Sequence, residues 1–232
     1  MPDATATFWS LYGQTAAALF AQIGELDGLR QRQLSAAERR LGFALPMLLR
    51  QFFLRVGKRR DLTRKYHRLL SPGELRVPAE TLLFFEQSQQ VVYWGIKVAD
   101  VGVADPPVWQ ANSHTKKRLS WYPDHDHLSD FFITMLYRQF LEYGENSGAM
   151  LISKQTLSAI RRGWPEFKLR GKNLGAMELF ARDGQALCVF RQGQQLELLA
   201  AGRTEQEFLD IGQRLGLVEE LCGVEATGDE ES

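Results

Sequence analysis

Apolar residues recur at helical spacing in the first quarter of the chain. Residues 1–29 are predicted to contain an N-terminal helix, because several of their apolar residues share one helix face. These residues are Tyr12, Ala16, Leu19, Phe20 and Ile23. Ser35-Ala36-Ala37-Glu38 matches a capping box, so we expect a second helix that starts at Ser35 and stops at Gly42. Leu45-Pro46 predicts the start of a third helix, because proline suits a first turn, and Gly57 is its expected C-cap.

The pattern then changes to that of buried strands. Residues 82–85 and 91–96 are apolar on both faces and flank a polar turn, which predicts an antiparallel hairpin covered on both sides. Trp94 is expected in the core, and Gly95 either admits a close neighbour or is an ordinary strand glycine. Asp105-Pro106-Pro107 ends the ladder, because neither proline can donate an amide hydrogen.

Residues 128–143 have the strongest helical pattern in the chain. Their apolar side chains line one face, which predicts a helix packed on a core. Ser129 or Asp126 is the expected cap, since both side chains can accept a hydrogen bond from a first-turn amide. The polar residues 145–148 that follow are too weak a signal to mark a domain boundary.

The last third of the chain predicts a hairpin, a further strand and a helix. Asp183-Gly184 is a strong hairpin turn signal between two apolar runs. Residues 196–200 predict a third strand. Thr204 begins the last helix, with Glu207 at the capping-box position.

Composition narrows the class of protein. The chain has 232 residues, 44% of them apolar, which is enough for one large domain or two small ones. The 28 basic and 28 acidic residues balance, which argues against a dedicated nucleic-acid binder. Cys188 and Cys222 form no CxxC pair, and Cys188 is expected to be a buried thiol. No secretory signal and no apolar run of the ~18–20 residues that a membrane span requires are found, so we expect a cytoplasmic protein.

Candidate chemistry is sparse. Asp124-His125-Asp126-His127 has the highest density of histidine and aspartate, and alternation along an extended segment would put both histidines on one face. The same residues suit a turn before a helix N-terminus, where acidic groups favour the helix dipole. Because no third ligand is fixed nearby, we expect no metal and no cofactor. No nucleophile with an aligned base and an orienting group can be nominated, so no catalytic residue is expected.

Basic residues crowd two segments, 58–68 and 116–118. Such segments could grip phosphates, although they are more often solvated loops. A third interpretation is that they meet an acidic protein partner and accelerate the encounter by electrostatic steering. We expect both to be loops.

Six motifs occur in a fixed order along residues 34–143. They are Ala37-Glu38-Arg39-Arg40-Leu41-Gly42-Phe43-Ala44-Leu45-Pro46, Leu49-Arg50, Leu70-Ser71-Pro72, residues 86–96, Asp105-Pro106-Pro107-Val108-Trp109 and Leu128-Ser129-Asp130-Phe131-Phe132. Together they resemble the SUKH superfamily, which unites bacterial toxin-immunity proteins with the yeast cell-wall assembly regulator. The signature positions are Glu38, Gly42, Leu45, Pro46, Trp94, Gly95, Asp105, Pro106 and Pro107. Gln87-Ser88 departs from the acidic residue and asparagine expected at that turn.

The resemblance implies an α/β fold of the α+β kind, in which helices pack on one side of a mainly antiparallel sheet. We expect this single domain at residues 34–222, an N-terminal helical extension at 1–33 and a disordered acidic tail at 223–232. The resemblance also implies a non-enzymatic role, the neutralisation of a cognate toxin by occlusion of its active surface. The yeast relative implies an alternative, a regulatory scaffold, and a nucleic-acid-binding protein is less favoured.

The predicted contact surface lies on or beside the sheet, near the proline corner. Its candidate residues are Trp109, His114, Lys116, Lys117 and Arg118. Tryptophan is enriched at binding hot spots and charges surround them, whereas burial in the core is the competing interpretation of Trp109. The expected partner is a protein, and no membrane contact is expected.

Overall fold

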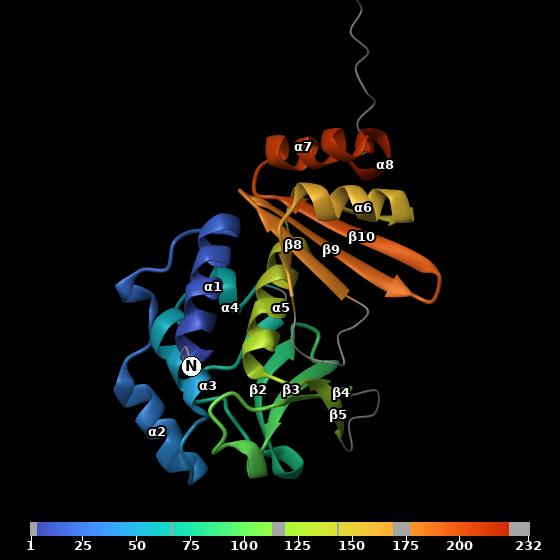
Figure 1. Ribbon diagram of the computed structural model, residues 1–232. Coiled ribbons are helices and arrows are strands. Elements are labelled where there is room, and N and C mark those ends of the chain that lie inside the picture. The colour runs from blue at the N-terminus through green and yellow to red at the C-terminus, as the bar shows by residue number, and fades with distance from the viewer. Residues whose placement is uncertain (1–3, 66, 113–118, 143, 169–176, 223–232) are drawn as a thin grey trace, which may run out of the picture. The chain divides into compact units, whose positions relative to one another are not determined.

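The computed structural model describes residues 4–65, 67–112, 119–142, 144–168 and 177–222 (Figure 1). It is a mixed α+β structure with antiparallel sheets, which confirms the expected fold class. The strands form two five-stranded sheets, where the sequence predicted one. The chain divides into two compact units: the first contains the described residues of 4–17 and 21–139, and the second those of 18–20, 140–168 and 177–222.

The helices of the first unit come mostly from the N-terminal part of the chain. They are α1 (Ala4–Leu19), η1 (Glu25–Asp27), α2 (Gln31–Leu41), α3 (Met47–Val56) and α4 (Arg60–Thr63). Tyr12 of α1 contacts Phe52 of α3 edge to face at 5.3 Å, and Phe52 stacks on Phe132 at 3.7 Å between ring centroids. Residues 1–33 were expected as an extension, yet Tyr12 is part of the aromatic core of this unit.

The sheet of the first unit follows the order β1-β2-β3-β4-β5, with every pair antiparallel. Its strands and the short helices between them are β1 (His67–Leu69), η2 (Pro78–Glu80), β2 (Thr81–Gln87), β3 (Val92–Lys97), η3 (Val98–Asp100), β4 (Val108–Asn112) and β5 (Ser120–His125). The predicted hairpin is therefore confirmed as β2 and β3. A register shift between Leu83 and Phe85 bends β2.

One face of this sheet is covered by α5 (Leu128–Leu141). The ring of Phe131 lies 5.3 Å from that of Phe85 and 5.9 Å from that of Trp94. Trp94 is 2% exposed, which confirms its predicted place in the core. Its indole nitrogen donates to Asp124 at 3.1 Å, so the polar end of a buried ring is satisfied.

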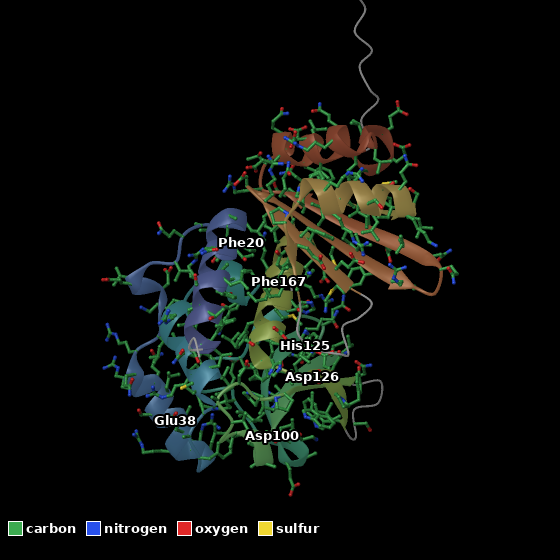
Figure 2. All side chains as sticks on the ribbon, viewed as in Figure 1. Phe20, Glu38, Asp100, His125, Asp126 and Phe167 are labelled. Atoms are coloured by element: carbon green, nitrogen blue, oxygen red, sulfur yellow. The ribbon has the colours of Figure 1, made fainter. Side chains whose placement is uncertain are left out.

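The predicted start of the second helix is wrong. α2 begins at Gln31, and Gln33 accepts the hydrogen bond from the Arg30 amide at its N-terminus. Ser35 therefore lies inside the helix, and Glu38 does not face its amide. The Glu38 carboxylate accepts from the amide of Leu45 at 3.2 Å and pairs with Arg50 at 3.2 Å. Figure 2 labels Glu38.

The proline corner holds the start of α5. Asp105 accepts hydrogen bonds from the backbone amide of Ser129 at 2.8 Å and from its hydroxyl at 2.7 Å. The amide of Leu128 donates to the carbonyl of Pro106 at 2.8 Å. Ser129 was one of two predicted caps, but it lies inside the helix, and the carboxylate that accepts from its amide comes from 24 positions earlier in the chain.

Residues 58–68 were expected to form a loop, but they contain α4 and β1. Arg59 pairs with Asp61 at 2.7 Å and with Asp27 at 3.1 Å. Arg68 pairs with Glu74 and with Glu86. Lys58 and Arg64 also have partners, the carbonyl of Leu26 and the carboxylate of Glu74, so several of the basic side chains are engaged within the fold.

The second unit is a five-stranded sheet in the order β6-β10-β9-β8-β7, covered on one face by helices (Figure 1). Its elements are β6 (Ser147–Ile152), α6 (Lys154–Gly163), β7 (Glu166–Phe167), β8 (Met177–Arg182), β9 (Gln185–Gln192), β10 (Gln195–Gly202), α7 (Glu205–Leu215) and α8 (Val218–Cys222). Its core contains Ile160, Phe180 and Leu198. Cys188 is buried, as predicted.

Local signals in this unit are confirmed. Asp183 and Gly184 have φ of 34° and 83°, as a two-residue hairpin turn requires. Thr204 accepts from the amide of Glu207 at 3.2 Å, and Glu207 accepts from the amide of Thr204 at 2.9 Å. The capping box of the last helix therefore forms as predicted, between residues three positions apart.

Candidate functional site

The sheet of the first unit has a second face, opposite α5, which two tryptophans and a lysine occupy. Directly paired residues of neighbouring strands share a face. Gly95 pairs with Trp109, which pairs with Pro123, and the next row contains Ala111 paired with Trp121. We call Lys97, Trp109 and Trp121 the tryptophan face. All three side chains are half-buried.

Lys97 is the centre of this face. Its Nζ lies 4.9 Å from the centroid of the Trp109 ring and 5.8 Å from that of the Trp121 ring. Such contacts contribute about 0.5–2 kcal/mol each, depending on desolvation. The ammonium also donates to the hydroxyl of Thr81 at 3.1 Å. Among the described residues no carboxylate pairs with it.

The two indoles add further donors. The Nε1 atoms of Trp109 and Trp121 are buried, and neither has an acceptor among the residues that the structure describes. An indole nitrogen can only donate, as can an ammonium. The tryptophan face therefore has three donor groups, for which the Thr81 hydroxyl is the only acceptor found in the described part of the chain.

Gly95 makes this arrangement possible. A Cβ added at Gly95 would lie 3.0 Å from Cη2 of Trp121 and 2.5 Å from Cγ2 of Thr81. The absence of a side chain lets the Trp121 ring lie close to the strand. Of the two interpretations of Gly95 in the sequence, the close neighbour is the one found, and the side chains that lie close are those of Thr81 and Trp121.

An apolar groove adjoins the tryptophan face. It has a volume of about 810 Å³ and is lined by Leu41, Phe43, Val77, Ala79, Glu80, Lys97, Val98 and Ala99. The side chains come from the end of α2 and the residues after it, from the turn before β2, and from the end of β3 and the start of η3. Lys97 belongs to both the groove and the tryptophan face, so the two form one continuous surface.

The wall of the groove contains a strained turn. Ala79 and Glu80 have φ of 49° and 54°, in the left-handed region that non-glycine residues rarely adopt. Thr81 follows them and donates its hydroxyl to the carbonyl of Ala79 at 3.1 Å while accepting from Lys97. Strain of this kind is concentrated at binding and catalytic sites.

Residues between the end of α2 and the start of α3 hold the other wall of the groove in place. Gly42 has φ of 83° and closes α2, its amide donating to the carbonyl of Glu38 at 2.9 Å. Glu38 holds Leu45, so the short segment that carries Phe43 is anchored at both ends. Pro46 precedes α3 as its N-cap residue. These residues hold the wall of the groove in place, but they are not part of the tryptophan face.

Of the predicted contact residues, Trp109 lies on the candidate surface. His114, Lys116, Lys117 and Arg118 lie outside the described residues. Lys97 and Trp121 were not identified as contact residues from the sequence. They are 24 positions apart in the chain, and only the pairing of the strands brings them together. The alternation in β5 was a signal that could have placed Trp121 on the same face as Trp109.

The histidines of the Asp124–His127 segment do not meet. His125 is buried, with Nδ1 2.8 Å from Asp124 and Nε2 3.2 Å from the Thr134 hydroxyl. His127 lies 3.9 Å from Asp105, at the start of α5 (Figure 2 labels His125). In the described residues no cluster of three potential metal ligands occurs, here or elsewhere.

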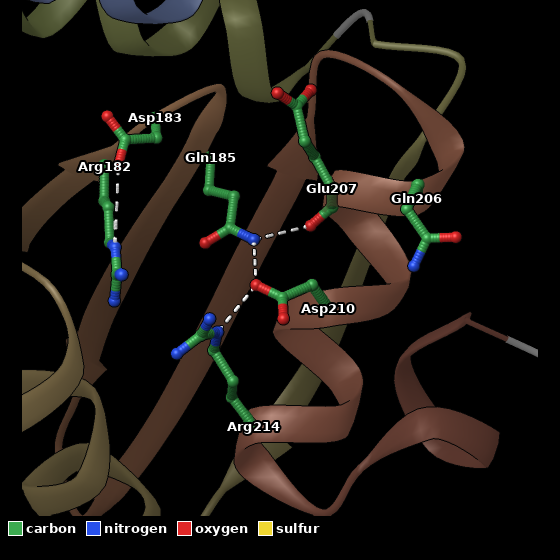
Figure 3. Close-up of a pocket in the computed structure, with 7 residues that line it drawn as sticks. All are labelled: Arg182, Asp183, Gln185, Gln206, Glu207, Asp210 and Arg214. Carbon is green, nitrogen blue, oxygen red and sulfur yellow. Dashed lines mark hydrogen bonds and ion pairs between the residues drawn. The ribbon is translucent and has the colours of Figure 1, made fainter.

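The second unit has a polar pocket of about 310 Å³ (Figure 3). At its base the buried Gln185 donates to Asp210 at 2.7 Å and to the carbonyl of Glu207 at 2.8 Å, and accepts from the Trp164 indole at 2.9 Å. The hydrogen bond from Arg214, with a further one from Gln185, lowers the pKa of Asp210 against the effect of burial. The pocket's polar groups bind one another, which indicates a structural role.

None of the helices in the described part of the chain has the length and apolar character needed to cross a membrane. Comparisons with protein-family models, with curated proteins and with solved structures find no match for this chain.

Proposed function

We propose that this chain is a non-catalytic protein-binding module, and that the tryptophan face with its adjoining groove is the docking surface. The observation that carries the proposal is Lys97, a half-buried ammonium on two indole rings with no acidic partner among the described residues. Aromatic rings and desolvated charges dominate the energy of protein interfaces.

The supporting fold is suited to a preformed surface. Both tryptophans are on paired strands, β4 and β5, and Lys97 is at the end of β3, which pairs with β2 and β4. A side chain on a regular strand loses less conformational freedom on binding than one on a loop. A standard interface covers roughly 800 Å² of each partner, and the face and groove together offer its apolar and charged centre.

The surface offers little for covalent chemistry. Lys97 and Glu80 are the ionisable side chains that line the groove, and no ion pair joins them. Lys97 directs its ammonium at ring faces and at a hydroxyl, so no base activates it. A nucleophile requires an adjacent base and an orienting group. Recognition is therefore the function that these contacts favour.

The resemblance to the SUKH superfamily supports an immunity role. The residues of its six motifs, which lie between positions 37 and 132, all belong to the first unit. In this proposal the partner is a cognate toxin domain, and the mechanism is occlusion: the toxin's active surface lies against the tryptophan face and is closed to substrate.

The test is co-expression of the full chain with the product of the adjacent gene, with growth and co-purification as readouts. The proposal predicts that growth is rescued and that the two proteins co-purify. Replacement of Lys97 by Glu is expected to abolish both, whereas Leu151→Ser, a change at a 60% exposed residue of the second unit, retains both. If the pair neither co-purifies nor rescues growth, the immunity role is rejected, and recovery of several housekeeping proteins instead would favour the regulatory scaffold.

A further inference from the structure

We infer that the docking surface takes an acidic segment of its partner, in which one carboxylate meets Lys97 and a neighbouring apolar side chain enters the groove. This inference rests on the proposed function and specifies the partner's chemistry. It follows from three properties of the surface: a cation with no acidic partner among the described residues, a surplus of donors, and an apolar groove that begins at the same lysine.

Two acidic residues of the same sheet, Glu86 and Asp124, are engaged by other partners. Glu86, on the same face of the sheet as Tyr93, is 2% exposed and pairs with Arg68 and Arg76. Asp124 accepts from the Trp94 indole and contacts His125. Lys97 is left with the Thr81 hydroxyl and two ring faces. Its charge is therefore open to a carboxylate supplied by another molecule.

The Lys97 ammonium has donor hydrogens left for that carboxylate. An ammonium has three donor hydrogens, and Lys97 uses one of them on Thr81. A hydrogen bond between two charged groups is roughly twice as strong as a neutral one. Because the rings of Trp109 and Trp121 hold the ammonium in place, it requires little further ordering when the partner binds.

The groove selects the neighbouring residue. Leu41, Phe43, Val77 and Val98 provide apolar lining, and its volume of about 810 Å³ holds a large aliphatic or aromatic side chain. In an extended segment, side chains two positions apart point to the same side. An apolar residue two positions from an acidic one therefore places one side chain in the groove and the other on Lys97.

Glu80 disfavours a partner segment that contains several acidic residues. This exposed carboxylate lines the same groove and makes no ion pair with Lys97. It repels a second carboxylate, because like charges disfavour each other at close range. The surface consequently favours a segment with a single acid next to an apolar residue over a run of acids.

A single-stranded nucleic acid fits this face less well. Such ligands stack their bases on open aromatic faces. Here the Lys97 ammonium lies on a face of each indole, and the Trp121 ring lies close to Gly95. The balance of 28 basic and 28 acidic residues adds no general attraction for phosphates.

The experiment titrates the full chain with two synthetic peptides, acetyl-Ser-Leu-Thr-Glu-Ser-amide and its counterpart with Gln in place of Glu. The readout is the indole N–H signals of the 5 tryptophans in nitrogen–proton correlation spectra, assigned by single Trp→Phe variants. Peptide concentrations up to about 5 mM detect millimolar binding. We expect the acidic peptide to shift the Trp109 and Trp121 signals and to bind at least about fivefold more tightly than the amide peptide.

Variants of Lys97 test whether its positive charge causes the preference for the acidic peptide. Lys97→Met is expected to bring the acidic peptide down to the affinity of the amide peptide, and Lys97→Arg to keep most of the difference. Thermal melting of each variant verifies that it is folded. The inference is overturned if neither peptide shifts the two signals, if both bind equally well to the wild-type chain, or if a single-stranded oligonucleotide shifts them at lower concentration than the acidic peptide.

The two proposals fail in different ways. If the peptides show no acid preference but Lys97→Glu still abolishes rescue and co-purification in co-expression, the docking surface stands and the acidic segment is rejected. If the adjacent gene's product neither binds nor is neutralised while the peptides show the predicted preference, the immunity role is rejected and the acidic specificity of the surface stands.

Discussion

The Trp121 ring lies so close to Gly95 that an added Cβ would be 3.0 Å from its Cη2 atom. Thr81 closes the other side, with Cγ2 2.5 Å from the same position. Strand pairing brings these residues together: Thr81 pairs with Lys97, and Gly95 pairs with Trp109. The tryptophan face is therefore built around a position that has room for no side chain.

Replacement of Gly95 by Ala tests this packing. We expect the variant to lose about 1–3 kcal/mol of unfolding free energy, the usual cost of overpacking. The indole signal of Trp121 should shift more than that of Trp94, which packs on the α5 side of the sheet. Urea denaturation and the correlation spectrum measure the two effects. An unchanged midpoint together with an unchanged Trp121 signal would show that the ring does not lie on Gly95.

The link between the proline corner and α5 makes a second prediction. Asp105→Ala removes both hydrogen bonds to Ser129 and the negative charge at the helix N-terminus, which is expected to cost about 1–2 kcal/mol. Asp126→Ala is the comparison variant, since Asp126 precedes the same helix and is one of the two caps that the sequence alone predicted. Chemical denaturation compares the two. A larger loss for Asp126 than for Asp105 would contradict the assignment of the cap.

Glu38 and Ser35 make a third pair. Glu38→Ala breaks the bonds to Leu45 and Arg50 and leaves that amide without its acceptor, at a cost of about 1–2 kcal/mol. Ser35→Ala lies inside α2, where alanine is the better helix former, so stability is expected to stay within about 0.5 kcal/mol or to rise. A larger loss of stability for Ser35→Ala than for Glu38→Ala would support the capping box that the sequence predicted at Ser35.

Acidification is expected to lower the stability of the first unit, because it protonates Glu74. Burial raises the pKa of this carboxyl, but hydrogen bonds from Ser71 and Arg68 outweigh it and lower the pKa from 4.5 to about 2. A pKa depressed in the folded state gives stability that is complete above pH 4.5 and is lost as the pH falls toward 2. The pKa values of Asp27 and Asp61 are lowered too, so they add to this loss.

The measurement is urea unfolding at several pH values between about 5 and 2.5, on the wild-type chain and on Glu74→Gln. The variant should be less stable near pH 5 and should lose less stability than the wild-type chain on acidification. Parallel curves for the two proteins would mean that Glu74 does not titrate with a lowered pKa.

Elements encoded by neighbouring residues could be predicted from the sequence. Gly42 ends α2, Asp183 and Gly184 form the predicted turn, and Thr204 forms the predicted capping box. Each of these signals acts over four residues or fewer, so no distant contact competes with it. Ser35 failed because a helix that already begins at Gln31 leaves no free amide for its hydroxyl.

Features that depend on distant residues could not be predicted. The bond from Ser129 to Asp105 and the contact between Lys97 and Trp121 each join residues 24 positions apart. The division into two units was equally hidden, because β6 starts within the polar residues 145–148 and its strand character comes from its pairing with β10. Trp109 was a candidate contact residue with core burial as the competing interpretation, and its partner Lys97 had no signal of its own.

The most direct test of the docking surface is a calorimetric titration of the full chain with the product of the adjacent gene. The proposal predicts that Lys97→Glu weakens binding at least about 30-fold, as expected for a hot-spot residue, and that Leu151→Ser in the second unit leaves the affinity unchanged. The opposite pattern, in which Lys97→Glu binds like the wild-type chain while Leu151→Ser loses affinity, would place the interface away from the tryptophan face and contradict the proposal.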